Sequence, residues 1–281
     1  MPTVSLPDRA LVSVSGPEAR SFLQNIVTAD LDALAADELR ACALLSPQGK
    51  ILFDFLVSSE GNDGLRLDIR ADAAADFARR LAMYRLRAKV EIGPPQDAGA
   101  VVAWEESAAE GLRDTRFPAE WHVVRRYSVD SDEGARDSWD ALRIRAGVAE
   151  SGHDYPLGDA FPHDVLFDQN GGVALRKGCF VGQEVVSRMH HRGTARRRIV
   201  LVSAASSLPT PGADVLAGGK TIGTLGTTLG SEGLALLRLD RVTEARAAGE
   251  AITVEGVPVE VALPPGVSFG FPTAESQAPS A

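Results

Sequence analysis

The residues with the clearest chemical potential lie in one octapeptide, Lys177-Gly178-Cys179-Phe180-Val181-Gly182-Gln183-Glu184. Glycines let the backbone approach a ligand closely, and a neighbouring cation favours a thiolate over a thiol. The pattern therefore predicts that Cys179 is reactive or metal-binding and that Lys177 promotes its ionisation. We expect Gln183 and Glu184 to hold the loop through hydrogen bonds to its backbone. The alternative is that Cys179 is a small buried hydrophobe, as lone cysteines often are.

A basic run follows the octapeptide, from Arg188 to Arg198, with five arginines, two histidines and no acidic residue. It could bind an anion, or it could form a solvated edge strand whose charges prevent edge pairing. His190 and His191 are candidate metal ligands because imidazole suits iron and zinc. On a strand, adjacent side chains point to opposite faces, so at most one of them would share a site with Cys179. The alternative is that both histidines are solvated.

The composition limits the class of protein. The chain has 281 residues, a formal net charge of −9 and two cysteines. The negative charge argues against broad nucleic-acid or membrane-surface binding, which needs a positive field. The apolar runs are too short for a transmembrane helix, and the N-terminus lacks the pattern of a secretory signal. The second cysteine, Cys42, lies in an apolar run that predicts a core position, so we expect a cytoplasmic chain without disulfides.

The elements that position these residues are predicted from hydrophobic periodicity and turn signals. Residues 46–50, Ser-Pro-Gln-Gly-Lys, would close a hairpin. Strands are expected at residues 9–15, 41–45, 51–57, 65–69, 89–92, 100–104 and 121–126, and helices from residue 16 through Phe22, Leu23, Ile26 and Val27, at 71–84 and at 135–146. This order, in which many strands follow one another directly, favours an α+β fold.

The pattern changes near residue 196 to short strands bounded by glycines. Strands are expected at residues 199–202, 214–216, 221–226, 234–239, 251–254 and 258–261, with a short helix at 243–247. Such spacing predicts a small β-barrel over residues 196–270. Residues 1–195 would form the preceding region, in one or two subdomains. The residues after Phe271 are small and polar, so we expect a disordered tail over residues 271–281.

The octapeptide resembles the signature of the YgfZ family, which is related to the T-protein of the glycine cleavage system and to a mitochondrial iron–sulfur maturation factor. The similarity covers roughly residues 9 to 263 and includes Val14-Ser15-Gly16, Phe22-Leu23-Gln24 with Thr28, Ser46 to Lys50, Tyr84 with Lys89-Val90, and Arg192-Gly193. The resemblance implies a folate-binding fold of the aminomethyltransferase type, arranged around a central cavity and followed by the C-terminal β-barrel.

The resemblance also implies a function. Proteins like this are accessory factors more than established enzymes: they bind tetrahydrofolate and serve the assembly or repair of iron–sulfur clusters. Cys179 would act there with scaffold or carrier proteins and with client enzymes. One cysteine cannot supply the four ligands of a cluster, so the cluster would be transient and shared. The chain would be a monomer, since a cavity within one chain needs no dimer.

Candidate folate residues also follow from the resemblance. Trp139 lies in a segment similar to one that carries a folate-contacting tryptophan in the family, and Tyr84 could form a second wall. Asp54 and Arg143 complete the predicted cofactor-binding set. A flat pterin needs aromatic walls, and its glutamate tail needs cations. The alternative for Trp139 is an ordinary core position on an amphipathic helix.

Two other functions stay open. The first is tetrahydrofolate-dependent aminomethyl transfer through Asp54. Against it, Phe53 replaces one of the paired aspartates of the T-protein, and Arg145 stands where a glutamate would accept the pterin N–H groups. The second is an RNA or tRNA-modification module that uses Arg196 to Arg198. The acidity of the chain and the lack of interleaved aromatic residues disfavour it.

Overall fold

A computed structural model describes residues 2–61, 64–105, 110–127, 136–191, 193 and 195–272. The chain divides into two compact units, Met1–Ser138 with Asn170–Ser187 (unit 1) and Trp139–Gln169 with Arg188–Ala281 (unit 2). The polypeptide therefore passes between the units after Ser138, Gln169 and Ser187. Residue 135 of the predicted helix and residues 273–281 of the predicted tail lie outside the described residues. Within the described ranges, no helix is both long and apolar enough to cross a membrane.

Unit 1 is built on a sheet with short helices. Its described strands are β1 (Thr3–Leu6), β2 (Arg9–Ser15), β3 (Glu38–Leu45), β4 (Ile51–Glu60), β5 (Gly64–Arg70), β6 (Glu91–Ile92), β7 (Gln96–Asp97), β8 (Ala100–Ala103), β9 (Leu112–Asp114) and β10 (Val124–Arg126). Its helices are α1 (Ala19–Gln24), α2 (Ala71–Arg85) and the 3-10 helix η1 (Ala119–Trp121). Two further helices, α3 (Arg136–Ala146) and α4 (Gln183–His191), contribute residues to both units.

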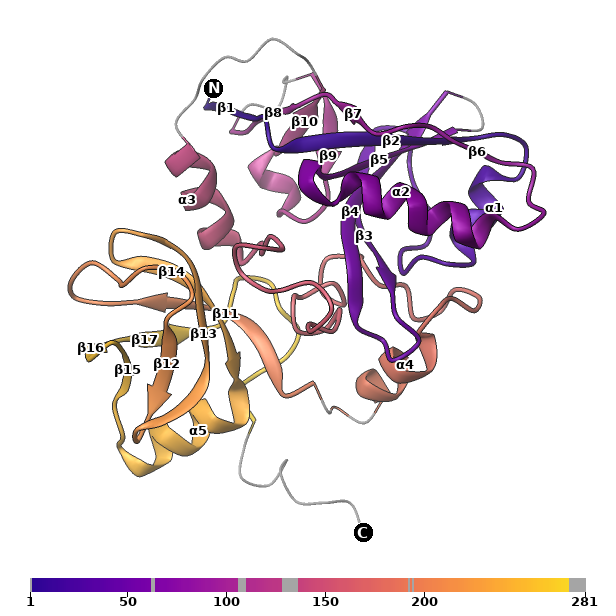
Figure 1. Ribbon diagram of the computed structural model, residues 1–281. Helices are drawn as coiled ribbons and strands as arrows, with labels where there is room; N and C mark the ends of the chain where they lie inside the picture. Colours follow the sequence, from indigo (N-terminus) through magenta and orange to yellow (C-terminus); the bar gives the residue numbers. More distant parts are fainter. Residues whose placement is uncertain are drawn as a thin grey trace. The chain divides into compact units, whose positions relative to one another are not determined.

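The sheet of unit 1 has the strand order β1-β8-β10-β9-β3-β4-β5-β2-β6, with β7 also paired to β2. Strands β3 and β9 are parallel, while β3 and β4 form an antiparallel hairpin. The predicted turn at residues 46–50 closes this hairpin, with the Ser46 N–H donating to the Lys50 carbonyl at 2.8 Å. Figure 1 shows the tip of the hairpin beside α4, which carries the end of the octapeptide.

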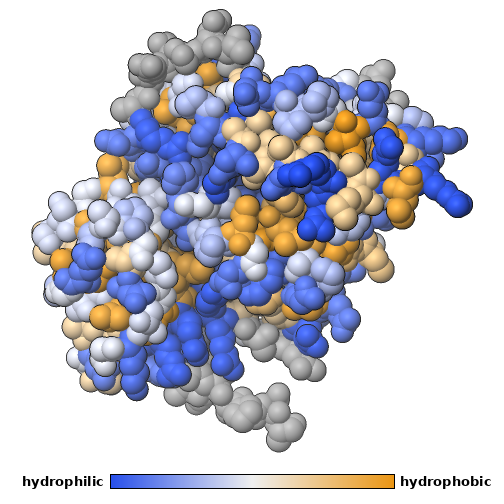
Figure 2. Space-filling view, in the orientation of Figure 1, coloured by the Kyte–Doolittle hydropathy of each residue, from blue (hydrophilic) through white to orange (hydrophobic). Residues whose placement is uncertain are grey.

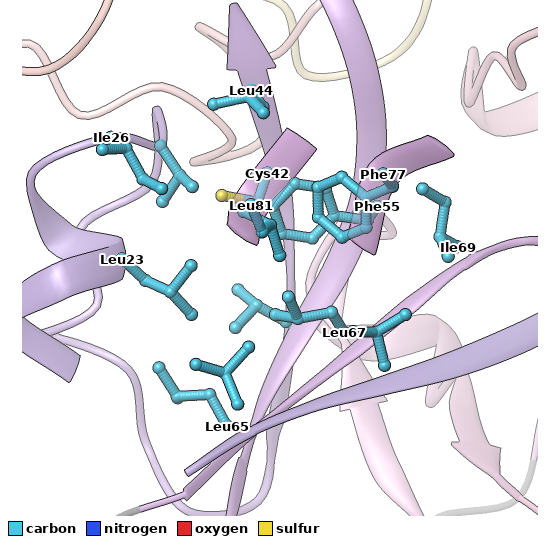
Figure 3. Close-up of a cluster of buried hydrophobic side chains, with 14 of the residues drawn as sticks. Leu23, Ile26, Cys42, Leu44, Phe55, Leu65, Leu67, Ile69, Phe77 and Leu81 are labelled. Carbon is cyan, nitrogen blue, oxygen red and sulfur yellow. The ribbon is translucent and has the colours of Figure 1, made fainter. Parts of the chain in front are cut away.

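The core of unit 1 lies between the sheet and α2. Phe77 and Leu81 are fully buried on one face of α2, at the spacing of an amphipathic helix. The Phe77 ring centroid lies 4.8 Å from that of Phe55 and 5.3 Å from that of Phe53, both on β4. Alternate residues of β5 face the same core, and Figure 3 shows them in one cluster with Phe77: Leu65, Leu67 and Ile69.

Unit 2 contains the predicted barrel. Its strands are β11 (Arg197–Ser203), β12 (Asp214–Ala217), β13 (Lys220–Leu229), β14 (Glu232–Arg238), β15 (Ile252–Val254), β16 (Val257–Pro258) and β17 (Glu260–Ala262), in the order β16-β15-β12-β13-β14-β11-β17. The end strands β16 and β17 are separated only by Val259, so one continuous segment pairs with β15 and with β11 and thereby closes the barrel. Helix α5 (Leu239–Ala248) lies at one end of the barrel (Figure 1).

The predicted elements are largely present, and the differences have local causes. Helix α1 ends at Gln24, so Val27 lies beyond it and instead forms a β-bridge with Leu44 of β3. The predicted strand at 121–126 is shorter because residues 119–121 form η1 and His122 then takes a φ of 47°. Three strands were not expected from the sequence: β1, β7 and β9. They have four, two and three residues, which is too short for a clear periodic signal.

Candidate functional site

The octapeptide lies in unit 1, on the loop that leads into α4. Thr28 fixes the chain just before it. The Thr28 hydroxyl donates to the Gly172 carbonyl at 2.6 Å, and the Ala174 N–H donates to the Thr28 carbonyl at 2.9 Å. The same hydroxyl accepts the N–H of Ala43 on β3 at 2.9 Å. This fully buried threonine therefore ties the approach to the octapeptide to the sheet.

Lys177 provides the next anchor. Its ammonium donates to the carbonyls of Val27 at 2.7 Å and Ala29 at 2.8 Å, and it lies 5.3 Å from the ring centroid of Phe180. Burial lowers the pKa of Lys177 from its ordinary value. These contacts attach the loop to the residues that follow α1. They do not involve Cys179, so they give no support to the predicted role of Lys177 in ionising that thiol.

Gly182 anchors the other end of the loop. Its φ is +77°, and a Cβ there would lie 2.5 Å from the Ser46 carbonyl oxygen and 3.0 Å from the Gly49 Cα. Gly49 has a φ of +80°, and a Cβ there would lie 3.1 Å from the Cβ of Val185. These two glycines let the turn of the β3–β4 hairpin pack directly against the start of α4.

Cys179 is exposed between these anchors. Gly178 beside it is also exposed, whereas Phe180 is buried. The Gln183 N–H donates to the Phe180 carbonyl at 3.2 Å, which closes the turn before α4, and Glu184 is exposed in the first turn of that helix. The alternative of a buried Cys179 is therefore wrong. Loop-holding hydrogen bonds from the Gln183 and Glu184 side chains remain a prediction.

The second cysteine has the opposite environment. Cys42 is fully buried in the core of unit 1, as predicted, and Figure 3 shows it among Leu44, Phe55 and Leu81. Burial raises the pKa of its thiol. In the part of the chain that the structure describes, no group of three or more histidine, cysteine or acidic side chains could hold a metal ion. Of the two thiols, Cys179 faces solvent and Cys42 is enclosed.

His190 and His191 lie in the last turn of α4, and both are exposed. The prediction that they belong to a strand is wrong. Val186 is buried and Met189 is half-buried, three residues apart, so the run has a helical apolar face that its basic residues concealed. The two imidazole centroids are 5.5 Å apart. Neighbours on a helix diverge by about 100°, so they do not point to opposite faces.

Sequence reasoning missed His163, which lies in unit 2 and is 1% exposed. Its ring centroid lies 6.1 Å from that of His190, and neither of its ring nitrogens has a hydrogen-bond partner among the residues that the structure describes. Burial lowers the pKa of His163 to about 4; Asp168 opposes this shift, while Arg198 and His190 add to it. A single histidine in an irregular segment gives no periodic signal, so the sequence alone could not identify it.

Carboxylates pair with two arginines at the end of the basic run. Arg197 pairs with Asp164 at 2.8 Å, and the buried Arg198 pairs with Asp168 at 2.6 Å. Of the three arginines predicted for RNA contact, Arg196 is exposed. The expectation of an edge strand is also wrong, because β11, which begins at Arg197, pairs with β14 on one side and β17 on the other.

Two predicted folate residues lie in unit 2 and are already engaged. Trp139 is fully buried, and its indole N–H donates to Glu150 at 3.2 Å. Arg143 is also fully buried and pairs with Asp154 at 2.9 Å and Asp140 at 2.7 Å. Burial opposes its charge, but Glu150, Asp154 and Asp140 outweigh that effect and raise the pKa of Arg143. Neither side chain presents a free group to a pterin or a glutamate tail, so both fit folate poorly.

The other two predicted folate residues lie in unit 1. Asp54 is half-buried on β4, opposite Ala43 of β3. Tyr84 is half-buried near the end of α2 and packs against the core of the unit. Their role in cofactor binding remains a prediction.

Comparison with solved structures and domain families supports the architecture. Residues 196–269 match the family described as the CAF17 C-terminal β-barrel domain. Aminomethyltransferase T of the glycine cleavage system from Bartonella henselae superposes with a TM-score of 0.69 at 16% identity, covering 94% of this chain and 86% of that chain. The predicted α+β fold of the aminomethyltransferase type, with its C-terminal barrel, is therefore confirmed.

Sequence relatives identify the family. The mitochondrial iron–sulfur cluster assembly factor IBA57 of Homo sapiens is 31% identical over 280 residues, covering 84% of this chain and 77% of the human protein. The IBA57 homolog of Pyricularia oryzae is 32% identical over 217 residues, and this match spans 70% of the chain and 56% of the fungal protein. From the extent of the match to the human protein, the chain belongs to the IBA57 family of iron–sulfur cluster assembly factors.

Proposed function

We propose that this protein serves the assembly or repair of iron–sulfur clusters and that Cys179 lends one thiolate to a cluster held jointly with a partner. The observation that carries this proposal is the exposed Cys179 on a loop fixed by Lys177 and Gly182. Thiolates are the usual protein ligands of such clusters. The relatives are named iron–sulfur cluster assembly factors, which supports the same role. Placement in the bacterial YgfZ branch remains a prediction.

The number of thiols limits what Cys179 does. A cluster normally takes four protein ligands, whereas this chain has two cysteines and Cys42 is enclosed in the core. The remaining ligands would come from a scaffold or carrier protein, a client enzyme or small thiols. The anchored loop presents the sulfur without first having to be ordered, which lowers the entropic cost of a brief shared complex.

The proposed role of Cys179 does not require tetrahydrofolate. A fold shared with an aminomethyltransferase does not by itself carry that activity or its cofactor. Trp139 and Arg143 are engaged with carboxylates in the structure. Folate binding therefore remains a prediction that would use other groups, and equilibrium titration with tetrahydrofolate decides it: saturable binding supports it, and its absence rejects it.

The test is anaerobic reconstitution with iron and sulfide, with the chain alone and with a cluster-loaded scaffold protein. We expect cluster absorption on the chain only when the scaffold is present. Cys179→Ser should reduce it at least tenfold, while the control Cys42→Ala, which keeps the exposed thiol, should retain it. A cluster formed by the chain alone, or wild-type behaviour of Cys179→Ser, would contradict the proposal.

A further inference from the structure

The end of α2 carries exposed apolar side chains that the proposed thiol site does not use. Among the described residues, the large hydrophobic side chains with high exposure are Met83, at 68%, and Leu86, at 87%. Phe77 and Leu81 of the same helix are fully buried, so Met83 lies on the outer side. Figure 2 shows pale and orange residues intermixed with dark-blue ones over the region where α2 lies in Figure 1.

The exposure of Leu86 is imposed by its surroundings. Its φ is 45°, in the left-handed region that a bulky residue rarely adopts. Tyr84 and Ala88 on either side pack against the core, and the Lys89 N–H donates to the Glu18 carboxylate at 2.9 Å. Such strain persists only where neighbouring contacts enforce it, and it concentrates at functional positions. The leucine is therefore held outward by fixed neighbours.

The segment that carries these two side chains is basic, opposite in sign to the whole molecule, although the Glu18 carboxylate accepts the Lys89 N–H and Asp76 pairs with Arg79. Between Asp76 and Glu91 the chain has no acidic residue and five cations, in a protein of net charge −9: Arg79, Arg80, Arg85, Arg87 and Lys89. The last three are exposed, and no carboxylate of a described residue forms an ion pair with their side chains. A local positive field on an acidic protein attracts acidic partners and disfavours others.

We propose that this surface docks an acidic segment of another protein that also presents apolar side chains. We name it the α2-end surface and define it as Met83, Arg85, Leu86, Arg87 and Lys89. The adaptable methionine and the leucine supply apolar contact, and the arginine forks match carboxylates. Two apolar side chains are too few to anchor a chain in lipid, and the net negative charge opposes an anionic membrane. The inference does not depend on the role of Cys179.

The test places a photocrosslinking amino acid, p-benzoylphenylalanine, at position 83 of the full chain in its native cells. Mass spectrometry then identifies the crosslinked peptide. We expect a protein segment with net negative charge and apolar residues next to the crosslink. The same label at Lys220, an exposed cation on β13 of unit 2, is the position control and should not capture that segment.

Two sets of variants test the chemistry. Arg85→Gln with Arg87→Gln should lower the crosslink yield at least fivefold, and so should Leu86→Gly, because glycine adopts the φ of 45° and ψ of −106° found at this position without strain and removes the apolar side chain. Circular dichroism and thermal unfolding should be unchanged in both. The proposal is overturned if no protein is captured, if the captured segment is not acidic, or if it comes from a second copy of this chain. It is also overturned if the surface binds only vesicles of phosphatidylcholine and phosphatidylglycerol.

Discussion

At the scale of single residues, the two glycines of the octapeptide differ in how strictly their positions require glycine. Gly182 combines a positive φ with close approach to Ser46 and Gly49, whereas a Cβ on Gly178 would meet no atom within 4 Å. Sequence reasoning predicted a permissive loop around Cys179 but could not separate these roles. The turn that crowds Gly182 lies more than a hundred residues earlier in the sequence, so only the folded chain reveals the contact.

We therefore predict that alanine destabilises the protein at Gly182 but has little effect at Gly178. Gly182→Ala should lower the free energy of unfolding by about 1–3 kcal/mol, because it adds a strained φ and a clash with the Ser46 carbonyl. Gly178→Ala should change it by less than about 0.5 kcal/mol. Urea unfolding measures both. Equal effects of the two substitutions would mean that the packing of the hairpin turn on Gly182 does not fix the loop.

Because His163 is buried, the free energy of unfolding should depend on pH. Its folded-state pKa of about 4 lies below the ordinary value of 6.5, so the unfolded chain binds the extra proton between these values. The free energy of unfolding should fall as the pH drops from 6.5 to 4, by up to about 3 kcal/mol. His163→Leu should flatten this part of the profile in urea titrations, and the exposed His153→Gln should leave it as in the wild type. An unchanged profile in His163→Leu would refute the assignment.

At the scale of elements, periodicity predicted most of what positions the site, including the β3–β4 hairpin, α2 and the barrel strands. It failed where charge hid the pattern. The basic residues of α4 concealed its apolar face, and Arg143 sits fully buried on α3 because Asp140, Glu150 and Asp154 surround its guanidinium. Ion pairs of this kind leave no mark on the periodicity of apolar residues, even though the partners of Arg143 lie within about a dozen residues of it.

Replacing Arg143 tests whether its ion-pair cluster stabilises unit 2. Arg143→Met should lower the free energy of unfolding by about 3–5 kcal/mol, because it leaves Asp154 and Glu150 buried without their cation. Arg145→Met, at an exposed position of the same helix, is the matched control and should cost less than about 1 kcal/mol, because contacts of an exposed arginine contribute little. Chemical denaturation compares them. If Arg143→Met were as stable as the control, the ion-pair cluster would not support unit 2.

At the scale of the whole molecule, the path of the chain links the stability of the two units. The chain passes between them after Ser138, Gln169 and Ser187, and the boundaries after Ser138 and Ser187 fall inside α3 and α4. Sequence reasoning expected a boundary near residue 196, where the barrel pattern begins. It could not foresee that residues 139–169 cluster with the barrel, because that depends on contacts such as the one between Arg143 and Thr227.

We predict that both units unfold in one transition. Unfolding one unit alone would break α4 near its middle and α3 within its first turn, and would leave backbone groups unpaired at the new helix ends. Hydrogen–deuterium exchange with mass spectrometry, followed against urea concentration, should give the same midpoint for peptides from β2–β5 and from β11–β14. A lower midpoint for the barrel peptides would show that unit 2 unfolds independently.

The contrast between the two cysteines has a consequence for oxidative damage. A sulfenic acid on Cys179 would have no accessible second thiol in the same molecule to condense with, because Cys42 is sealed in the core. Any disulfide that it forms would therefore join it to glutathione, to another protein or to a second copy of the chain. The chain thus depends on other molecules to rescue its exposed sulfur before overoxidation becomes irreversible.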